Sequence, residues 1–183
     1  MTILHIDSSI NGENSASRAI SRSIVEQFKI DRSEAGVVYR DLAAEPLPHL
    51  TLEAFVDTSV LHEFLAADVV VIGAPMYNFT LPTQLKAWID RILVAGQTFR
   101  YTVNGPEGLA SGKRVIVALA RGGFYEHGSP ASALEHLETY LRGIFNFIGI
   151  EPEFVAADGL NISPEQRRES IDLALGDTMR LAA

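Results

Sequence analysis

The sequence of 183 residues contains no cysteine. Disulfide bonds, thiolate nucleophiles and cysteine-bound metal ions are therefore excluded. No apolar run approaches the roughly 20 residues that a membrane-spanning helix needs. The first predicted strand begins at Thr2, with no basic and apolar leader before it, so we expect a soluble, cytoplasmic protein with no membrane partner.

Positive charge is also scarce. Fifteen Lys and Arg residues stand against 23 Asp and Glu residues, which gives a net charge of −8 and argues against nucleic acid or an anionic membrane as a partner. Histidines 5, 49, 62 and 136 are scattered without the spacing of metal ligands, so we assign no metal. Both phosphate-binding glycine signatures, the Walker loop and G-x-G-x-x-G, are missing.

The residues that are present alternate between short apolar runs and helical stripes. Helices are predicted at 17–30, 52–67, 85–93 and 131–147, with a last one from Pro164, and strands at 2–7, 37–41, 68–73, 113–120 and 153–157. Asn104-Gly105 predicts a hairpin between the third helix and the fourth strand. The pattern predicts one α/β domain over 1–183, with a doubly wound, five-stranded parallel sheet in the flavodoxin-like order 2-1-3-4-5.

Two loops carry the strongest functional signal. Met76-Tyr77-Asn78-Phe79 follows the third predicted strand, and Arg121-Gly122-Gly123-Phe124-Tyr125 follows the fourth. Ligands of open α/β sheets bind beyond the carboxyl ends of the strands. An asparagine between aromatic residues and a glycine pair suit a flat ring whose polar edge is bound by backbone groups.

A third loop, after the first strand, is rich in serine. Ser9, Ser15 and Ser17 lie around the start of the first predicted helix, where unpaired N–H groups can bind an anion. A phosphate is one interpretation, with Arg18 as the only nearby cation. Ordinary helix capping by serine is the other.

Together these loops resemble those of the FMN-dependent NADH:quinone oxidoreductases, also called NADH-azoreductases, of flavodoxin-like fold. The resemblance covers nearly the whole chain and is sharpest at 74–79, 84–86, 98–102, 104–109 and 121–123. Two departures stand out. The connection between the second strand and the second helix looks shorter than in many relatives, and Ala120 replaces a frequent Ser or Thr.

The resemblance implies FMN as the cofactor and NADH or NADPH as the electron donor. The flavin would pass two electrons to quinones or azo compounds, and donor and acceptor would bind in turn in a ping-pong cycle. The phosphate would lie on Ser9, Ser15, Ala16 and Ser17. The ring would lie along Met76, Tyr77, Asn78 and Phe79, bordered at its pyrimidine edge by Ala120, Arg121, Gly122 and Gly123.

The predicted substrate pocket comprises Asn78, Phe99, Tyr101 and Phe124. No catalytic side chain is certain, but Tyr125 and His127 are candidates to hydrogen-bond a quinone oxygen or the flavin edge, or else are ordinary surface residues. Phe99 and Tyr101, together with Trp88, predict an apolar surface that a homodimer with shared sites would bury.

Three other functions are open to a sheet of this kind. A hydrolase using Asp7-Ser8 lacks a late histidine as its base, and a phosphoacceptor domain lacks an aspartate at the end of the third strand. A flavodoxin-type electron carrier, or an FMN-binding module without its own substrate, stays open as the alternative. The aromatic excursion at 99–103 argues against it, because a carrier needs only an exposed flavin edge.

Overall fold

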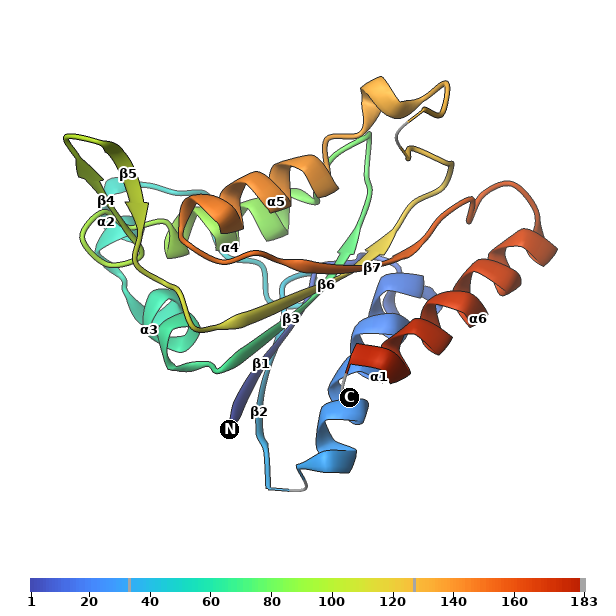
Figure 1. Ribbon diagram of the computed structural model, residues 1–183, viewed down its shortest axis with the longest axis horizontal. Coiled ribbons are helices and arrows are strands. Elements are labelled where there is room, and N and C mark those ends of the chain that lie inside the picture. The colour runs from blue at the N-terminus through green and yellow to red at the C-terminus, as the bar shows by residue number, and fades with distance from the viewer. Residues whose placement is uncertain (33, 127, 182–183) are drawn as a thin grey trace.

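The computed structural model describes residues 1–32, 34–126 and 128–181 (Figure 1). Its strands are β1 (Thr2–Asp7), β2 (Gly36–Asp41), β3 (Val69–Pro75), β4 (Phe99–Thr102), β5 (Gly105–Gly108), β6 (Arg114–Ala120) and β7 (Glu153–Ala157). Its α-helices are α1 (Ala16–Asp31), α2 (Leu52–Val56), α3 (Ser59–Ala66), α4 (Thr83–Ile92), α5 (Glu138–Phe147) and α6 (Pro164–Leu181), and short 3-10 turns lie at Gly12–Asn14 and Ser132–Leu134.

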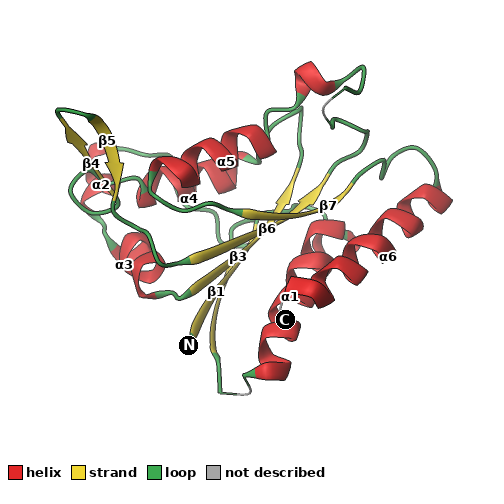
Figure 2. Ribbon diagram, in the orientation of Figure 1, coloured by secondary structure: helices red, strands yellow, loops and turns green. Residues whose placement is uncertain are grey.

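Five strands form one parallel sheet in the order β2-β1-β3-β6-β7. This confirms the predicted order 2-1-3-4-5, since β6 and β7 are the fourth and fifth strands of the prediction. Helices α1 and α6 lie on one face and α3, α4 and α5 on the other (Figure 2). Because both faces are covered, the central strand β3 is buried along its whole length.

Alternate residues of each strand serve two separate apolar cores. On β3, Val70 and Ile72 face the core under α3, α4 and α5, whereas Val69 and Val71 face the core under α1 and α6. The side-chain period of two in a strand causes this division. Among the residues that the structure describes, no helix is long and apolar enough to cross a membrane.

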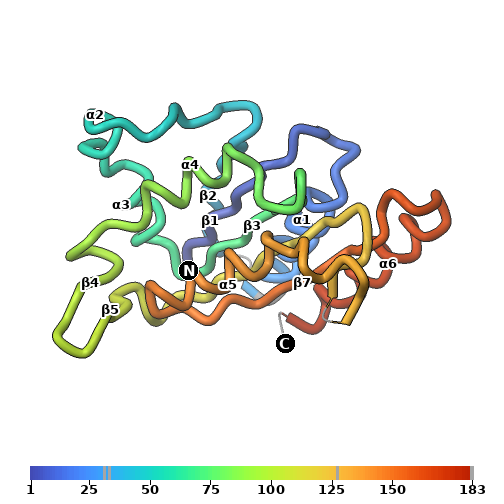
Figure 3. Tube along the Cα trace, turned by 90° about the horizontal axis from the view of Figure 1, so that it is seen from above, coloured from blue at the N-terminus to red at the C-terminus, as the bar shows by residue number. Residues whose placement is uncertain are grey.

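The two ends of the sheet carry different features. The chain leaves β1 for β2 on one side and returns to β3 on the other, so the switch point in strand order lies between β1 and β3. The hairpin of β4 and β5 follows α4, which runs back toward the amino ends of the strands. The hairpin therefore projects at the opposite end of the molecule from the loops that end β6 and β7 (Figure 3).

Two predicted helices were wrong in their extent. The helix predicted at 52–67 is broken into α2 and α3 at Asp57, whose carboxylate accepts the N–H of Ser59 at 2.9 Å. The helix predicted at 131–147 begins only at Glu138, because Glu135 caps the chain just before it. Side chains that bond the backbone locally compete with helix continuation, and the apolar stripe alone does not show this.

Candidate functional site

A cavity of about 150 Å³ lies at the carboxyl ends of β1, β3, β6 and β7. The three loops singled out in the sequence all contribute to it, through Ser9, Ser15, Ala16, Met76, Tyr77, Ala120 and Gly122. The cavity is also lined by residues that the sequence pattern did not indicate: Asn11, Leu160, Asn161 and Arg167. The last three follow β7, where the sequence has no glycine or aromatic cluster of the kind that marked the other loops.

The serine loop forms a polar wall of this cavity. Ser9, Ser15 and Ser17 are buried, and Ser9 and Ser15, but not Ser17, line the cavity. Ser15 is the N-cap of α1, its hydroxyl accepting the N–H of Arg18 at 3.3 Å. The hydroxyl oxygens of Ser15 and Ser17 lie 3.1 Å apart. Hydroxyls at the start of a 16-residue helix suit an anion, because the first-turn N–H groups point the same way.

The loop after β3 turns through a strained conformation. Asn78 has φ 47° and Phe79 has φ 73°, and the N–H of Tyr77 donates to the Thr80 carbonyl at 2.9 Å. Two positive φ angles inside a two-residue turn are the geometry that Asn-Gly normally supplies. Here phenylalanine occupies the glycine position, at a cost of about 1–3 kcal/mol.

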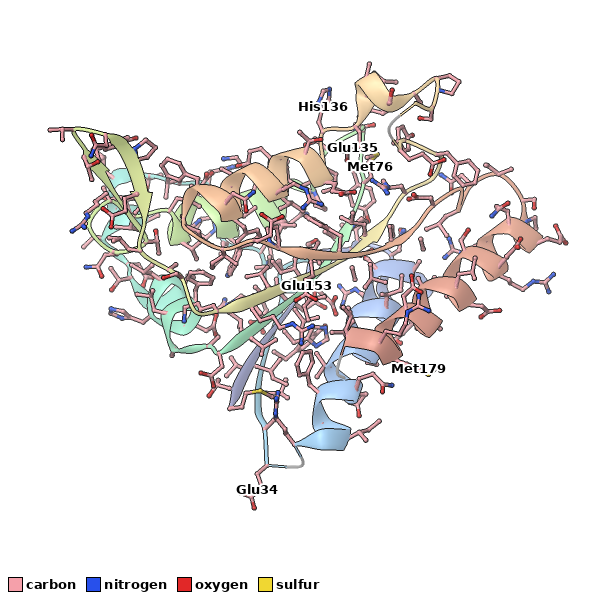
Figure 4. The ribbon with its side chains drawn as sticks, in the orientation of Figure 1. Glu34, Met76, Glu135, His136, Glu153 and Met179 are labelled. Carbon is pink, nitrogen blue, oxygen red and sulfur yellow. The ribbon has the colours of Figure 1, made fainter. Side chains whose placement is uncertain are left out.

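Contacts from outside the turn hold this conformation. The Phe79 carbonyl accepts the N–H of His136 at 3.0 Å, and the Thr80 hydroxyl donates to the His136 carbonyl at 3.2 Å. Figure 4 labels Met76, Glu135 and His136 at this end of the molecule, away from Glu34. Backbone strain maintained by surrounding structure is a mark of functional sites.

Tyr77 joins the loop after β3 to the serine loop. Its hydroxyl accepts the N–H of Ile10 at 3.1 Å and lies 3.2 Å from the hydroxyl of Ser9. The phenol thus fixes the spacing between the two walls of the cavity.

The glycine pair after β6 presents backbone donors. The carbonyls of Gly122 and Gly123 accept N–H groups from Asn161 at 3.0 Å and Gly159 at 3.1 Å. Within the described ranges, the N–H groups of Gly122 and Gly123 have no acceptor in the protein. A Cβ at Gly122 would lie 2.5 Å from Nδ2 of Asn161, so this position favours glycine and leaves its amide open to a ligand.

The side chain of Arg121 points away from the cavity. It is buried and forms a bidentate pair with Asp158, at 2.6 and 2.8 Å, and further ion pairs with Glu138 at 3.2 Å and Glu135 at 3.8 Å. Burial opposes its charge, but the hydrogen bonds to Asp158 and the nearby carboxylates outweigh this and raise the pKa of Arg121. Arg121 does not line this cavity but lines a neighbouring one together with Tyr125.

Arg18 is also committed elsewhere. Its guanidinium forms a bidentate pair with Asp41, both bonds 2.7 Å long, and donates to the Ser9 carbonyl. The hydrogen bond from Arg18 is the main cause that lowers the pKa of Asp41. Arg167 lines the cavity beside the serine loop and Arg18 does not, so Arg18 is not the only cation near that loop, as the sequence had suggested.

The remaining predicted residues of this edge lie around the turn after β3. Asn78 lines an adjoining cavity of about 350 Å³, and Tyr125 lines one of about 330 Å³. The rings of Phe79 and Tyr125 meet edge to face with centroids 6.2 Å apart. Phe124 is exposed and its ring covers Gly159. The predicted candidate His127 lies outside the described residues.

Phe99 and Tyr101 lie far from this cavity in their own chain. Phe99 anchors the hairpin by packing against Phe147, with centroids 4.7 Å apart, whereas Tyr101 is 76% exposed. Trp88 does not add to an exposed surface, as the sequence had suggested, because it is fully buried against Phe64. The apolar residues whose helical spacing predicted α4 face the core, and Trp88 is one of them.

The arrangement is suited to binding and orienting a ligand. It combines neutral hydroxyls, open amides, an arginine and aromatic rings beside the turn. In the part of the chain that the structure describes, no three His, Asp or Glu side chains are grouped so as to hold a metal ion.

Comparison with known proteins identifies relatives of the whole chain. A family model described as the flavodoxin-like fold matches residues 1–180. The chain is 51% identical over 207 aligned residues to the FMN-dependent NADH:quinone oxidoreductase of Rhizobium meliloti, and 52% identical over 201 to the FMN-dependent NADH:quinone oxidoreductase 2 of Bradyrhizobium diazoefficiens, with full coverage of both chains in each case.

Solved structures agree with these relatives. An azoreductase from Bacillus anthracis superposes with a TM-score of 0.91 at 28% identity, covering 100% of this chain and 98% of that one. An FMN-dependent NADH-azoreductase from the same species, solved in complex with FMN, superposes with a TM-score of 0.84 at 26% identity over the whole of both chains. The chain therefore belongs to the family of FMN-dependent NADH:quinone oxidoreductases.

Proposed function

We propose that this chain is an FMN-dependent oxidoreductase that uses NADH to reduce quinones and also azo compounds. The observation that carries the proposal is the cavity at the carboxyl edge, formed by the loops that resemble the family, in a chain about half identical to relatives of that name. When bound, FMN would supply the chemistry, accepting a hydride and passing on two electrons.

The residues present fit such a cofactor. Ser9, Ser15, Ala16 and Ser17 would hold the phosphate with hydroxyl and first-turn N–H donors. Met76, Tyr77, Asn78 and Phe79 would line the ring on one side, and Ala120, Arg121, Gly122 and Gly123 would border its polar edge through their backbone. The open amides of the glycine pair would stabilise negative charge on that edge.

Substrates would bind beside the turn after β3. Asn78, Phe124 and Tyr125 lie at this edge and would orient a flat acceptor. One face would serve donor and acceptor in turn, which gives a ping-pong cycle. The donor is NADH, in keeping with the names of the relatives.

The active unit would be a homodimer of single-domain chains. Within one chain, the hairpin that carries Phe99 and Tyr101 projects at the end of the sheet opposite the cavity. They would complete a substrate pocket only in a second copy, and the exposed ring of Tyr101 supports a contact there.

The deciding experiment is spectroscopic. Purified protein reconstituted with FMN should show the flavin spectrum, lose its visible band on anaerobic addition of NADH, and regain it when a quinone is added. A protein that does not retain FMN would contradict the proposal. Retention of FMN without reduction by NADH would instead favour the electron carrier.

A further inference from the structure

We propose that Arg167, in the first turn of α6, is a phosphate-binding residue of the cofactor site in this chain. This inference rests on the proposed function, because it assumes that FMN occupies the cavity. The phosphate-binding residues expected from the sequence are all on the serine loop, more than a hundred positions away in the chain.

The geometry places the guanidinium beside the serine loop. Arg167 lines the same cavity as Ser9 and Ser15. Its Nη2 donates to the Asn14 carbonyl at 2.8 Å, and Asn14 immediately precedes Ser15, the N-cap of α1. One N–H of the planar fork thus fixes the group at the start of α1, and the others stay available to an anion.

The charge of Arg167 is available where that of its neighbours is not. Arg18 is paired with Asp41, and Arg121 with Asp158. Among the described residues, no carboxylate lies within ion-pair distance of Arg167. A dianionic phosphate entering this cavity would therefore meet one uncompensated positive charge, and that charge comes from α6.

The surrounding structure holds Arg167 in this position. Ser163 caps α6, its hydroxyl accepting the N–H of Gln166 at 3.1 Å and its carbonyl accepting the N–H of Arg167 at 3.0 Å. The loop before it is bonded to the backbone of the Arg121-Gly122-Gly123 segment through the N–H groups of Gly159, Leu160 and Asn161. The segment that leads into Arg167 is thus hydrogen-bonded to the glycine pair that would border the ring.

The inference is tested by comparing FMN with riboflavin, which has the same ring and no phosphate. Dissociation constants for both would be measured from the quenching of flavin fluorescence by the flavin-free protein. R167Q should bind FMN about 10- to 100-fold more weakly than the wild type, because the phosphate loses a charged hydrogen-bond partner. Its affinity for riboflavin should stay close to that of the wild type. R167K keeps the positive charge but lacks the planar guanidinium, so its affinity for FMN should lie between those of the wild type and R167Q.

R168Q is the matched control. Arg168 is the next residue on the same helix, its side chain is 74% exposed, and it pairs with Glu165. R168Q should bind both flavins like the wild type. Should R167Q prove unstable, the ratio of FMN to riboflavin affinity in R167K provides the same comparison.

The outcomes separate the two proposals. Equal losses for FMN and riboflavin would assign Arg167 a purely structural role at Asn14 and overturn the inference. Unchanged FMN affinity in both R167Q and R167K would overturn it too, while the proposed function stood. A wild-type protein that binds neither flavin would overturn both.

Discussion

At the scale of single residues, the conformation of Asn78 and Phe79 is the clearest local sign of function. Both residues have positive φ, which glycine adopts freely and a bulky side chain does not. The chain keeps Phe79 there, in edge-to-face contact with Tyr125. The strain is balanced by the hydrogen bonds from His136 and Thr80, and the turn stays in place beside the cavity.

The turn can be tested by two substitutions of Asn78. Asn78→Val should destabilise the protein by about 1–2 kcal/mol, because a β-branched residue disfavours left-handed backbone, and should lower the FMN content of the purified protein. Asn78→Gly keeps the backbone accessible and removes only the amide. Urea unfolding and the ratio of flavin to protein absorbance are the measurements.

The comparison of the two variants separates backbone from side chain. If the turn itself positions the ring, Asn78→Gly should retain more FMN than Asn78→Val. Wild-type flavin content and turnover in Asn78→Val would show that this loop does not contact the ring.

At the scale of elements, the start of α5 depends on one carboxylate. The side chain of Glu135 accepts the N–H groups of Leu137 at 2.9 Å, Glu138 at 2.7 Å and Thr139 at 2.9 Å, as well as the Thr139 hydroxyl at 2.7 Å. Burial opposes ionisation of Glu135, but these hydrogen bonds outweigh it and hold the pKa below its usual value of 4.5.

The cap formed by Glu135 should make the stability of the protein depend on pH. Because the folded pKa is depressed, the stabilisation by Glu135 is fully present above about pH 4.5 and is lost as the pH falls through the lower folded pKa. E135Q should therefore cost about 1 kcal/mol near pH 7, and the difference from wild type should shrink below about pH 4.5. Urea unfolding across this range measures it.

The control for this prediction is E26Q on α1. Glu26 is exposed, and its one ion pair among the described residues is with Lys29 at 3.3 Å, so its replacement should change the stability by less than about 0.5 kcal/mol. A constant difference between E135Q and wild type down to acid pH would contradict a capping role for the ionised carboxylate.

At the scale of the whole molecule, the hairpin of β4 and β5 is the feature that a single chain leaves unexplained. Tyr101 and Val103 stand exposed at its tip, whereas Phe99 is needed to pack it on Phe147. Replacing Phe99 would loosen the hairpin as well as any contact, so the tip is the better place to test the proposed dimer.

Val103→Asp should separate assembly from folding. Because Val103 is fully exposed, the charge should leave the stability of the chain unchanged and disrupt an apolar contact between copies. We expect sedimentation equilibrium to show a dimer for the wild type and a shift toward monomer for Val103→Asp, with reduced turnover. Leu173→Asp, on the exposed side of α6, is the control and should remain dimeric. A fully active wild-type monomer would contradict the shared site.

Much of the fold follows from local pattern. Residues 69–75 form a continuous apolar run, which is typical of a strand that is buried on both faces of a parallel sheet. Apolar residues recur at helical spacing at Leu85, Trp88, Ile89 and Ile92, which predicts a helix packed on a core. Once strands and helices alternate, the handedness of the crossovers leaves few topologies. The carboxyl edge, and hence the three loops of the cavity, could therefore be located from the sequence.

Which side chains face the cavity was decided only by the tertiary structure. Arg18 is three residues from Ser15 in sequence but turns to Asp41 on β2, whereas Arg167 reaches Asn14 across more than 150 residues. The direction of Arg121 depends likewise on Asp158 and Glu138, which other elements bring to it. Helical and strand periodicity report only neighbours a few residues apart, so the sequence determined at which edge of the sheet the cavity lies, and long-range packing determined which charges line it.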